Sequence, residues 1–185
     1  MTIEDWDAPE EVMWAGDWIQ AKRRGKWEYV SRARGIRAAV ILPLDGPADN
    51  RQVILVDQYR VPVGCRVLEL PAGLIGDEAG REGEDPLAAA RRELEEETGY
   101  TAAHWQDCGT YLSSPGLTGE SFTLLKATGL TRVGDGGGTH EEDINVHRVA
   151  LADLPQVVAR FREQGFAIDV RLLMLLGTQI MGENA

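Results

Sequence analysis

Three glutamates that lie close together in the sequence could bind a divalent metal ion. Glu93, Glu96 and Glu97 are spaced i, i+3 and i+4, so on a helix their carboxylates project from one face. Each like-charged pair costs an isolated helix roughly 0.2–0.5 kcal/mol, and Arg92 can offset only part of that repulsion. Hard oxygen ligands on one face suit Mg²⁺, with Mn²⁺ as an alternative. Taken alone, the run also fits a solvated acidic surface helix.

The surrounding sequence predicts a short strand, a loop and a capped helix that would position these glutamates. A strand over Val67–Leu70 should stop at Pro71–Gly73, before a loop rich in Gly, Asp and Glu. Asp85 is a suitable N-cap, Pro86 loses no hydrogen bond at the first helical position, and Gly99 can end the helix in the left-handed conformation. A solvated helix would not need this arrangement, so the context favours a metal site.

The remaining pattern predicts strands interleaved with a few helices, which places the chain in the α/β (α+β) class. A hairpin is expected over 18–30, turning near Arg24 and Gly25, and a mobile loop over the glycine-rich residues 134–140. Further strands are expected at 36–44, 53–59, 105–112, 121–128 and 144–149, and helices at 151–164 and 169–181. We expect a small N-terminal β extension over 1–34 and one main domain over 35–185.

Composition limits the class of partner. The net charge of −11 over 185 residues argues against a nucleic-acid binder, which needs a basic surface. A small anionic substrate would instead need local arginines or a metal ion. The basic residues gathered between 22 and 37 could serve that purpose, or could simply decorate exposed strands.

Sequence features also favour a cytoplasmic location without membrane insertion. No apolar run approaches the roughly 20 residues that span a bilayer. The first residues are acidic, unlike the basic start of a secretory signal. The two cysteines, Cys65 and Cys108, support neither a disulfide framework nor a thiolate metal site, which fits a reducing compartment.

The helix and the residues before it resemble the Nudix hydrolase family. The Nudix box reads Gly, five residues, Glu, seven residues and Arg-Glu-U-X-Glu-Glu-X-Gly-U, where U is apolar. Glu84 and Arg92–Tyr100 match the second part in full, but ten residues separate Gly73 from Glu84 instead of five. The five-residue insertion falls within Ile75–Gly83, before the helix cap, so it leaves the carboxylate face intact and puts the role of Glu84 in doubt.

The resemblance implies the Nudix fold, a mixed β-sheet sandwiched between helices, and a magnesium-dependent pyrophosphohydrolase. It implies that Glu93, Glu96 and Glu97 bind the metal together with the backbone carbonyl of Ala72, and that Glu97 counts among the catalytic residues. Arg92 would orient a glutamate. Metal ions would clamp a diphosphate and activate water, so positioning and electrostatics would carry the rate.

Outside the box, the chain is similar to ADP-ribose pyrophosphatases over about residues 14–180. This similarity implies that Trp18 and Trp27 stack on adenine across a homodimer interface, although both could instead pack in a hairpin core. Glu28 would accept from the adenine amino group or pair with a basic neighbour across the strands. Pro115 is associated with ADP-ribose specificity. The similarity rests on the segments 16–18, 26–32, 58–60, 69–73, 113–118 and 141–144.

Arginines and loop glutamates complete the expected site. Arg32 and Arg60 suit phosphate or ribose contacts, since a guanidinium fork fits paired oxygens, while Arg60 could also form a surface salt bridge. Relatives carry a general base on a loop after the box, where Glu142 aligns best and Glu141 next; an exposed acidic loop is the alternative. Gly119 stands where relatives usually have an acidic residue, so Glu120 is expected only to support the site.

The sequence therefore predicts hydrolysis of ADP-ribose to AMP and ribose 5-phosphate. Another nucleoside diphosphate sugar, such as GDP-mannose, remains a rival substrate, because the box recognises only the diphosphate and the metal. A rival of another class is a non-catalytic sensor of nucleotide sugars. Such sensors tend to lose box carboxylates, whereas all three are present here.

Overall fold

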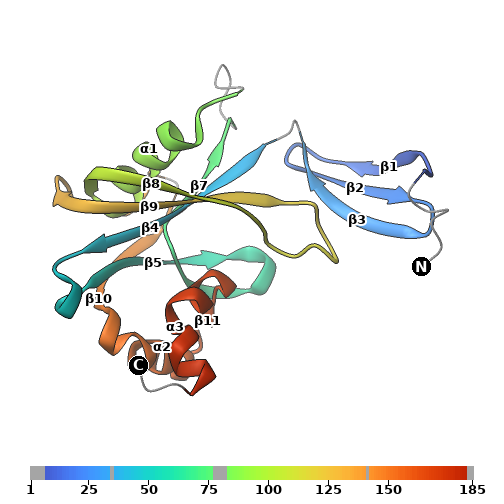
Figure 1. The fold of residues 1–185 in the computed structure, drawn as a ribbon. Helices are drawn as coiled ribbons and strands as arrows, with labels where there is room; N and C mark the ends of the chain where they lie inside the picture. Colours follow the sequence, from blue (N-terminus) through green and yellow to red (C-terminus); the bar gives the residue numbers. More distant parts are fainter. Residues whose placement is uncertain (1–6, 34–35, 77–82, 141, 183–185) are drawn as a thin grey trace.

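The computed structural model describes residues 7–33, 36–76, 83–140 and 142–182. Two sheets are present in this part of the chain: a three-stranded sheet at the N-terminus and an eight-stranded mixed sheet (Figure 1). Within those ranges, no helix has both the length and the apolar character needed to cross a bilayer.

The large sheet has the strand order β11-β6-β5-β4-β9-β8, with β10 paired to β5 and β7 paired to β4. The β4–β9 and β11–β6 pairs are parallel and the others antiparallel, so the sheet is mixed. Its strands are β4 (Arg37–Asp45), β5 (Gln52–Arg60), β6 (Cys65–Glu69), β7 (Ala72–Ile75), β8 (Tyr100–Leu112), β9 (Ser121–Arg132), β10 (Ile144–Ala150) and β11 (Ala167–Ile168).

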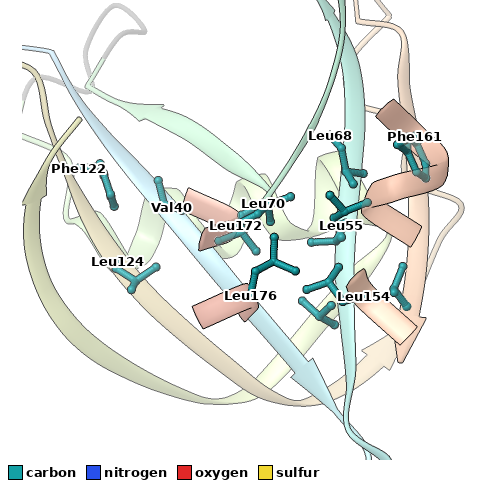
Figure 2. Packing of buried hydrophobic residues seen from close by; sticks show 13 residues of the cluster. Val40, Leu55, Leu68, Leu70, Phe122, Leu124, Leu154, Phe161, Leu172 and Leu176 are labelled. Atoms are coloured by element: carbon teal, nitrogen blue, oxygen red, sulfur yellow. The ribbon is translucent and has the colours of Figure 1, made fainter. Parts of the chain in front are cut away.

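Helices cover the large sheet on both sides, which confirms the expected fold class. On one side α1 (Pro86–Thr98) buries Ala89, Ala90 and Leu94 against the sheet. On the other side α2 (Leu154–Glu163) and α3 (Leu173–Met181) pack over a larger cluster (Figure 2). That cluster includes Val40, Leu55, Leu68, Leu70, Leu154, Phe161, Leu172 and Leu176. Burial of each of these side chains stabilises the fold by roughly 1.5–3 kcal/mol, because it removes apolar surface from water.

The helix α1 begins and ends where its capping residues predict. The Asp85 side chain accepts a hydrogen bond from the Ala88 N–H at 3.3 Å, and Pro86 occupies the first helical position. Gly99 adopts the left-handed conformation with φ of 72° and donates its N–H to the Glu95 carbonyl. These caps fix the register of the helix and therefore the face on which its glutamates lie.

The N-terminal sheet has three antiparallel strands, β1 (Glu10–Ala15), β2 (Ile19–Arg24) and β3 (Trp27–Arg32). The predicted hairpin is present, with its turn at Gly25 and Lys26, directly after Arg24. Part of the basic run lies on the surface of this sheet and forms salt bridges within it. Lys22 and Arg23 pair with Glu10 and Glu11 at 2.7 Å. The Val30 N–H donates to the Leu117 carbonyl at 3.0 Å, which joins β3 to the loop between β8 and β9.

Several elements differ from the expectation. The strands β1, β7 and β11 were not predicted individually, and Pro71 separates β6 from β7 instead of ending the extended chain. The segment expected as a helix over 151–164 starts with a 3-10 turn at Leu151–Asp153, and the one over 169–181 with a 3-10 turn at Val170–Leu172. The Asp169 side chain caps that second turn, so the α-helix begins only at Leu173. Two further 3-10 turns lie at Ala48–Asn50 and Val61–Val63.

Candidate active site

One large cavity, of about 690 Å³, collects most of the predicted site residues. Residues from α1, β3, β5, β6, β7, the β8–β9 loop, the segment before β10 and the segment after β11 line it. The predicted members are Arg32, Arg60, Ala72, Glu93, Glu97, Glu120 and Glu142. A volume of this size is typical of pockets that bind a whole small molecule.

Two glutamates of α1 line this cavity, Glu97 buried and Glu93 with 14% of its side chain exposed. Glu97 is only 3% exposed, and its Oε2 accepts a hydrogen bond of 3.0 Å from the Ala72 N–H. Burial, followed by the negative charge of Glu93, raises the pKa of Glu97 to about 8. Burial also raises the pKa of Glu93 to about 7, against the opposing effect of Arg92. Two such carboxylates close together need a proton or a cation to neutralise them.

The backbone leaves space for one of these carboxylates. A Cβ atom added to Gly73 would overlap the carboxyl group of Glu93, so only glycine admits this side chain beside β7. The carboxylate oxygens of Glu93 and Glu97 are of the hard type that Mg²⁺ and Mn²⁺ prefer. The cavity therefore fits a divalent cation.

Glu96 lies differently from its two neighbours. Its Oε2 accepts from Arg92 Nη1 at 3.1 Å, its side chain is 39% exposed, and it does not line the cavity. Among the described residues, no three acidic, His or Cys side chains converge on a ready-made metal site. The structure thus brings Glu93 and Glu97 together, while the role of Glu96 as a metal ligand stays a prediction.

Glu142 reaches the same cavity from the segment before β10. Its Oε2 accepts from the Thr139 N–H at 2.8 Å and from the Thr139 hydroxyl at 3.2 Å, and its charge contributes to the raised pKa of both Glu93 and Glu97. The other loop glutamate, Glu141, lies outside the described residues. The structure thus places Glu142 at the cavity, and its expected role as the general base stays a prediction.

The glycine-rich segment over 134–140, which was expected to be mobile, is hydrogen-bonded to the end of α1. The N–H groups of Gly137 and Gly138 donate to the carbonyls of Glu97 and Glu96 at 2.9 and 3.0 Å. A Cβ at Gly136 would collide with the backbone of Thr98. The glycines thus permit a close approach that satisfies the otherwise unpaired carbonyls at the helix end. The expected mobility of residues 134–140 stays a prediction.

Arg32 enters the cavity from β3 and is held by Glu120. The Arg32 Nε donates to Glu120 Oε1 at 2.7 Å, and Ser113 Oγ lies 3.4 Å from Glu120 Oε2. Glu120 therefore has the supporting position that the sequence suggested, orienting a guanidinium at the wall of the cavity.

Arg60 is also oriented by a carboxylate, but a buried one. Its Nε and Nη2 donate to Glu69 Oε1 and Oε2 at 2.7 and 2.8 Å. Glu69 is 2% exposed and lines the cavity, whereas the Arg60 side chain is 42% exposed, so the salt bridge considered from the sequence is present but anchored on a buried carboxylate. Sequence reasoning missed Glu69, Asp169 and Arg171 as cavity residues. Only the pairing of β11 with β6 brings them together, and no local pattern reports that pairing.

The expected base-binding residues other than Trp18 lie around a second, smaller cavity of about 300 Å³. Trp27, Glu28 and Pro115 line it together with Tyr29 and Leu112. Trp18 and Trp27 are 52% and 44% exposed, so they do not pack in a hairpin core. Glu28 also faces Arg23 across the β2–β3 ladder, although the Arg23 guanidinium binds Glu11.

Comparison with known proteins identifies the family of this chain. The family model of the NUDIX domain matches residues 35–162. The chain belongs to the Nudix family. The cavity glutamates, the strand that ends before Gly73 and the helix α1 all fall within the matched Nudix region.

Individual relatives support the same placement. The chain is 40% identical over 124 residues to an ADP-ribose pyrophosphatase of Mycobacterium tuberculosis, covering 66% of this chain and 56% of that protein. It is 37% identical over 133 residues to an ADP-sugar pyrophosphatase of Mus musculus, covering 64% and 59%. The match thus spans a little over half the length of these curated relatives.

A solved structure shows the same Nudix fold. The structure titled "Crystal structure of ADP compounds hydrolase" superposes with a TM-score of 0.66 at 21% identity, covering 94% of this chain and 92% of that one. At this sequence identity the likeness establishes the fold alone. The chemistry has to be argued from the residues of the cavity.

Replacement of Gly73 by alanine is expected to weaken Mn²⁺ binding by roughly 10- to 100-fold, because the new methyl group displaces the Glu93 carboxylate. Isothermal titration calorimetry with Mn²⁺ measures the effect. Gly116→Ala is the matched control, since a Cβ there meets nothing within 4 Å. Equal Mn²⁺ affinity in the two variants would contradict the position of the cation beside Glu93.

Proposed function

We propose that this protein is a divalent-metal-dependent pyrophosphohydrolase that cleaves ADP-ribose to AMP and ribose 5-phosphate. The observation that carries the proposal is that Glu93, Glu97 and Glu142 line the same cavity as Arg32 and Arg60. The names of the relatives, an ADP-ribose pyrophosphatase and an ADP-sugar pyrophosphatase, favour a diphosphate that bears adenosine. The two free cysteines suit a cytoplasmic location.

Each group of the cavity has a distinct task in this reaction. Glu93 and Glu97 hold the metal, assisted by the carbonyl of Ala72 and, on the prediction from the sequence, by Glu96. Bound Mg²⁺ supplies charge neutralisation of the diphosphate and acidifies a water molecule. Glu142 accepts the proton of the attacking water, and the Thr139 hydrogen bonds hold its carboxylate in place. Arg32 and Arg60 orient the diphosphate.

We further propose that the base binds at the smaller cavity and that two copies of the chain share it. Ile19 pairs with Arg32 and Arg24 with Trp27, so Trp18 and Trp27 lie at opposite ends of the β2–β3 ladder, roughly 20 Å apart. One chain cannot clamp a single ring between them. The N-terminal sheet also exposes Val12, Met13 and Trp14, an apolar surface that suits a homodimer contact through residues 1–34.

The wild-type protein is expected to release AMP from ADP-ribose with Mg²⁺, and a chelator to stop the reaction. Glu97→Gln should lower turnover roughly 100-fold or more, because it removes a metal-binding charge. Its melting temperature should not fall, since the amide can still accept from Ala72 N–H. Glu95→Gln, on the exposed face of the same helix, should retain full rate. Faster turnover of GDP-mannose than of ADP-ribose would overturn the proposed substrate. A near-full rate in Glu97→Gln would overturn the assignment of Glu97 to the metal.

The base is tested by comparing Glu142→Gln with Glu141→Gln. Loss of a general base lowers kcat on the order of 100- to 10,000-fold, so Glu142→Gln should do so while KM changes only a few-fold. Glu141→Gln should keep kcat within about threefold. Steady-state kinetics on ADP-ribose decide between them. The reverse pattern would assign the base to Glu141.

Complementation tests the shared base site. Trp18→Ala and Trp27→Ala should each raise KM for ADP-ribose about tenfold, because stacking on an aromatic ring is worth roughly 1–3 kcal/mol. When the two variants are coexpressed, mixed dimers contain one site with both tryptophans and one with neither. Part of the wild-type affinity should therefore return. A mixture that behaves as the average of its components would exclude the shared site.

A further inference from the structure

The cavity wall includes a segment that follows the NUDIX-matched region. Ala167 and Ile168 form β11, which pairs in parallel with β6, and the Asp169 N–H donates to the Leu68 carbonyl at 3.0 Å. The next residues, up to Arg171, line the same cavity as Glu93 and Glu97. Because the family match ends at residue 162, this wall is a feature of the chain beyond the common domain.

The segment reaches Arg60 through a shared carboxylate. Arg60 Nη2 lies 2.8 Å from Glu69 Oε2, and Arg171 Nη2 lies 3.3 Å from the same oxygen. The two Nη2 atoms are therefore no farther apart than the sum of these distances, about 6 Å. Glu69 is almost fully buried, and a buried carboxylate needs several donors to offset its lost hydration. Two guanidinium groups thus meet at one anion.

Arg171 is itself fixed from the other side. Its Nε and Nη2 donate to Asp169 Oδ1 and Oδ2 at 2.6 and 2.7 Å, and its backbone N–H donates to Asp169 Oδ1 at 2.7 Å. The guanidinium carbon lies 5.9 Å from the centre of the Phe122 ring. The side chain is thereby held between Asp169, Glu69 and an aromatic face, and little of it is exposed.

We propose that Arg171 is a positioning residue for Arg60, acting through Glu69, so that the segment after β11 sets the affinity for the substrate diphosphate. This inference rests on the proposed function. Arg171 also neutralises Asp169, whose charge, with that of Glu97, adds to the dominant effect of Glu69 in raising the pKa of Arg60. Without Arg171, Asp169 would compete with Glu69 for the Arg60 guanidinium and draw it away from the diphosphate.

The charge balance of the cavity makes this positioning matter. Acidic side chains in its lining outnumber the arginines, so an anionic diphosphate depends on each guanidinium being correctly oriented. The hydrogen bonds described for Arg60 and Arg171 use Nε and Nη2. A guanidinium carries five N–H donors, so both side chains keep donors beyond these contacts.

Kinetics of Arg171→Gln test the proposal. KM for ADP-ribose should rise on the order of tenfold with kcat within about threefold, since a charged hydrogen-bond network is lost outside the reacting atoms. Arg171→Lys, which keeps the charge without the fork, should recover part of the loss. Arg148→Gln is the matched control, because Arg148 pairs with Asp45 on β4 and does not line the cavity.

A double variant separates positioning from direct substrate contact. If Arg171 acts through Arg60, Arg60→Gln with Arg171→Gln should be no worse than Arg60→Gln alone, within about twofold. Multiplied effects would mean that Arg171 contributes independently, and the proposal would be overturned. All variants are compared at a temperature well below the melting temperature of the least stable one.

A readout without substrate keeps this test independent of the enzymatic activity. The ¹⁵N Nε–H signal of Arg60, assigned by its loss in Arg60→Gln, should shift in Arg171→Gln and Arg171→Lys but stay in place in Arg148→Gln. If the wild type hydrolyses no nucleoside diphosphate yet this shift occurs, the proposed function fails and the coupling stands. If the wild type is active while both the signal and KM are unchanged in Arg171→Gln, the inference fails alone.

Discussion

The structure depends on two neighbouring carboxylates of like charge, of which Glu97 is buried and Glu93 is largely shielded from solvent. Glu93 and Glu97 lie where α1 meets β7, and burial raises the pKa of each. Uncompensated charge in such a place costs several kcal/mol, so the fold must offer compensation. Gly73 leaves room for the Glu93 carboxylate, which pairs with Arg92 at 2.8 Å, and the Ala72 N–H binds Glu97; Arg92 also pairs with Glu96, so its single charge cannot neutralise both cavity carboxylates. This deficit of positive charge makes the cavity a site for a cation.

The same helix end also fixes the segment that carries Glu142. The last carbonyls of a helix lack partners within the helix, and here the N–H groups of Gly137 and Gly138 supply them. A Cβ at the neighbouring Gly136 would collide with the backbone of Thr98, and a Cβ at Gly138 would collide with the Glu142 side chain. One set of backbone hydrogen bonds therefore ends α1 and sets the distance between the proposed base and the buried carboxylates. A longer or less glycine-rich segment would lose this coupling.

What could be predicted from the sequence was local. The caps Asp85 and Gly99 fixed α1, and alternating apolar residues located most strands of the large sheet, because those signals act within a few residues. The strand β1 escaped because its residues are exposed and its pairing depends on charges on β2. The contact of Glu69 with Arg171 joins residues 102 positions apart, and no local pattern carries such information.

In an acidic protein that binds an anion, the groups that orient the anion need not be the groups that attract it. The cavity arginines each face a carboxylate: Arg32 binds Glu120, Arg60 binds Glu69 and Arg171 binds Asp169. These pairs hold the guanidinium groups in fixed directions but cancel most of their charge. The arginines therefore orient a bound anion more than they attract it. In the proposed reaction, the attraction must then come from metal held by Glu93 and Glu97. The divalent ion would supply most of the attraction, and arginines from three separate parts of the chain would add affinity only for a diphosphate that fits their fixed orientations.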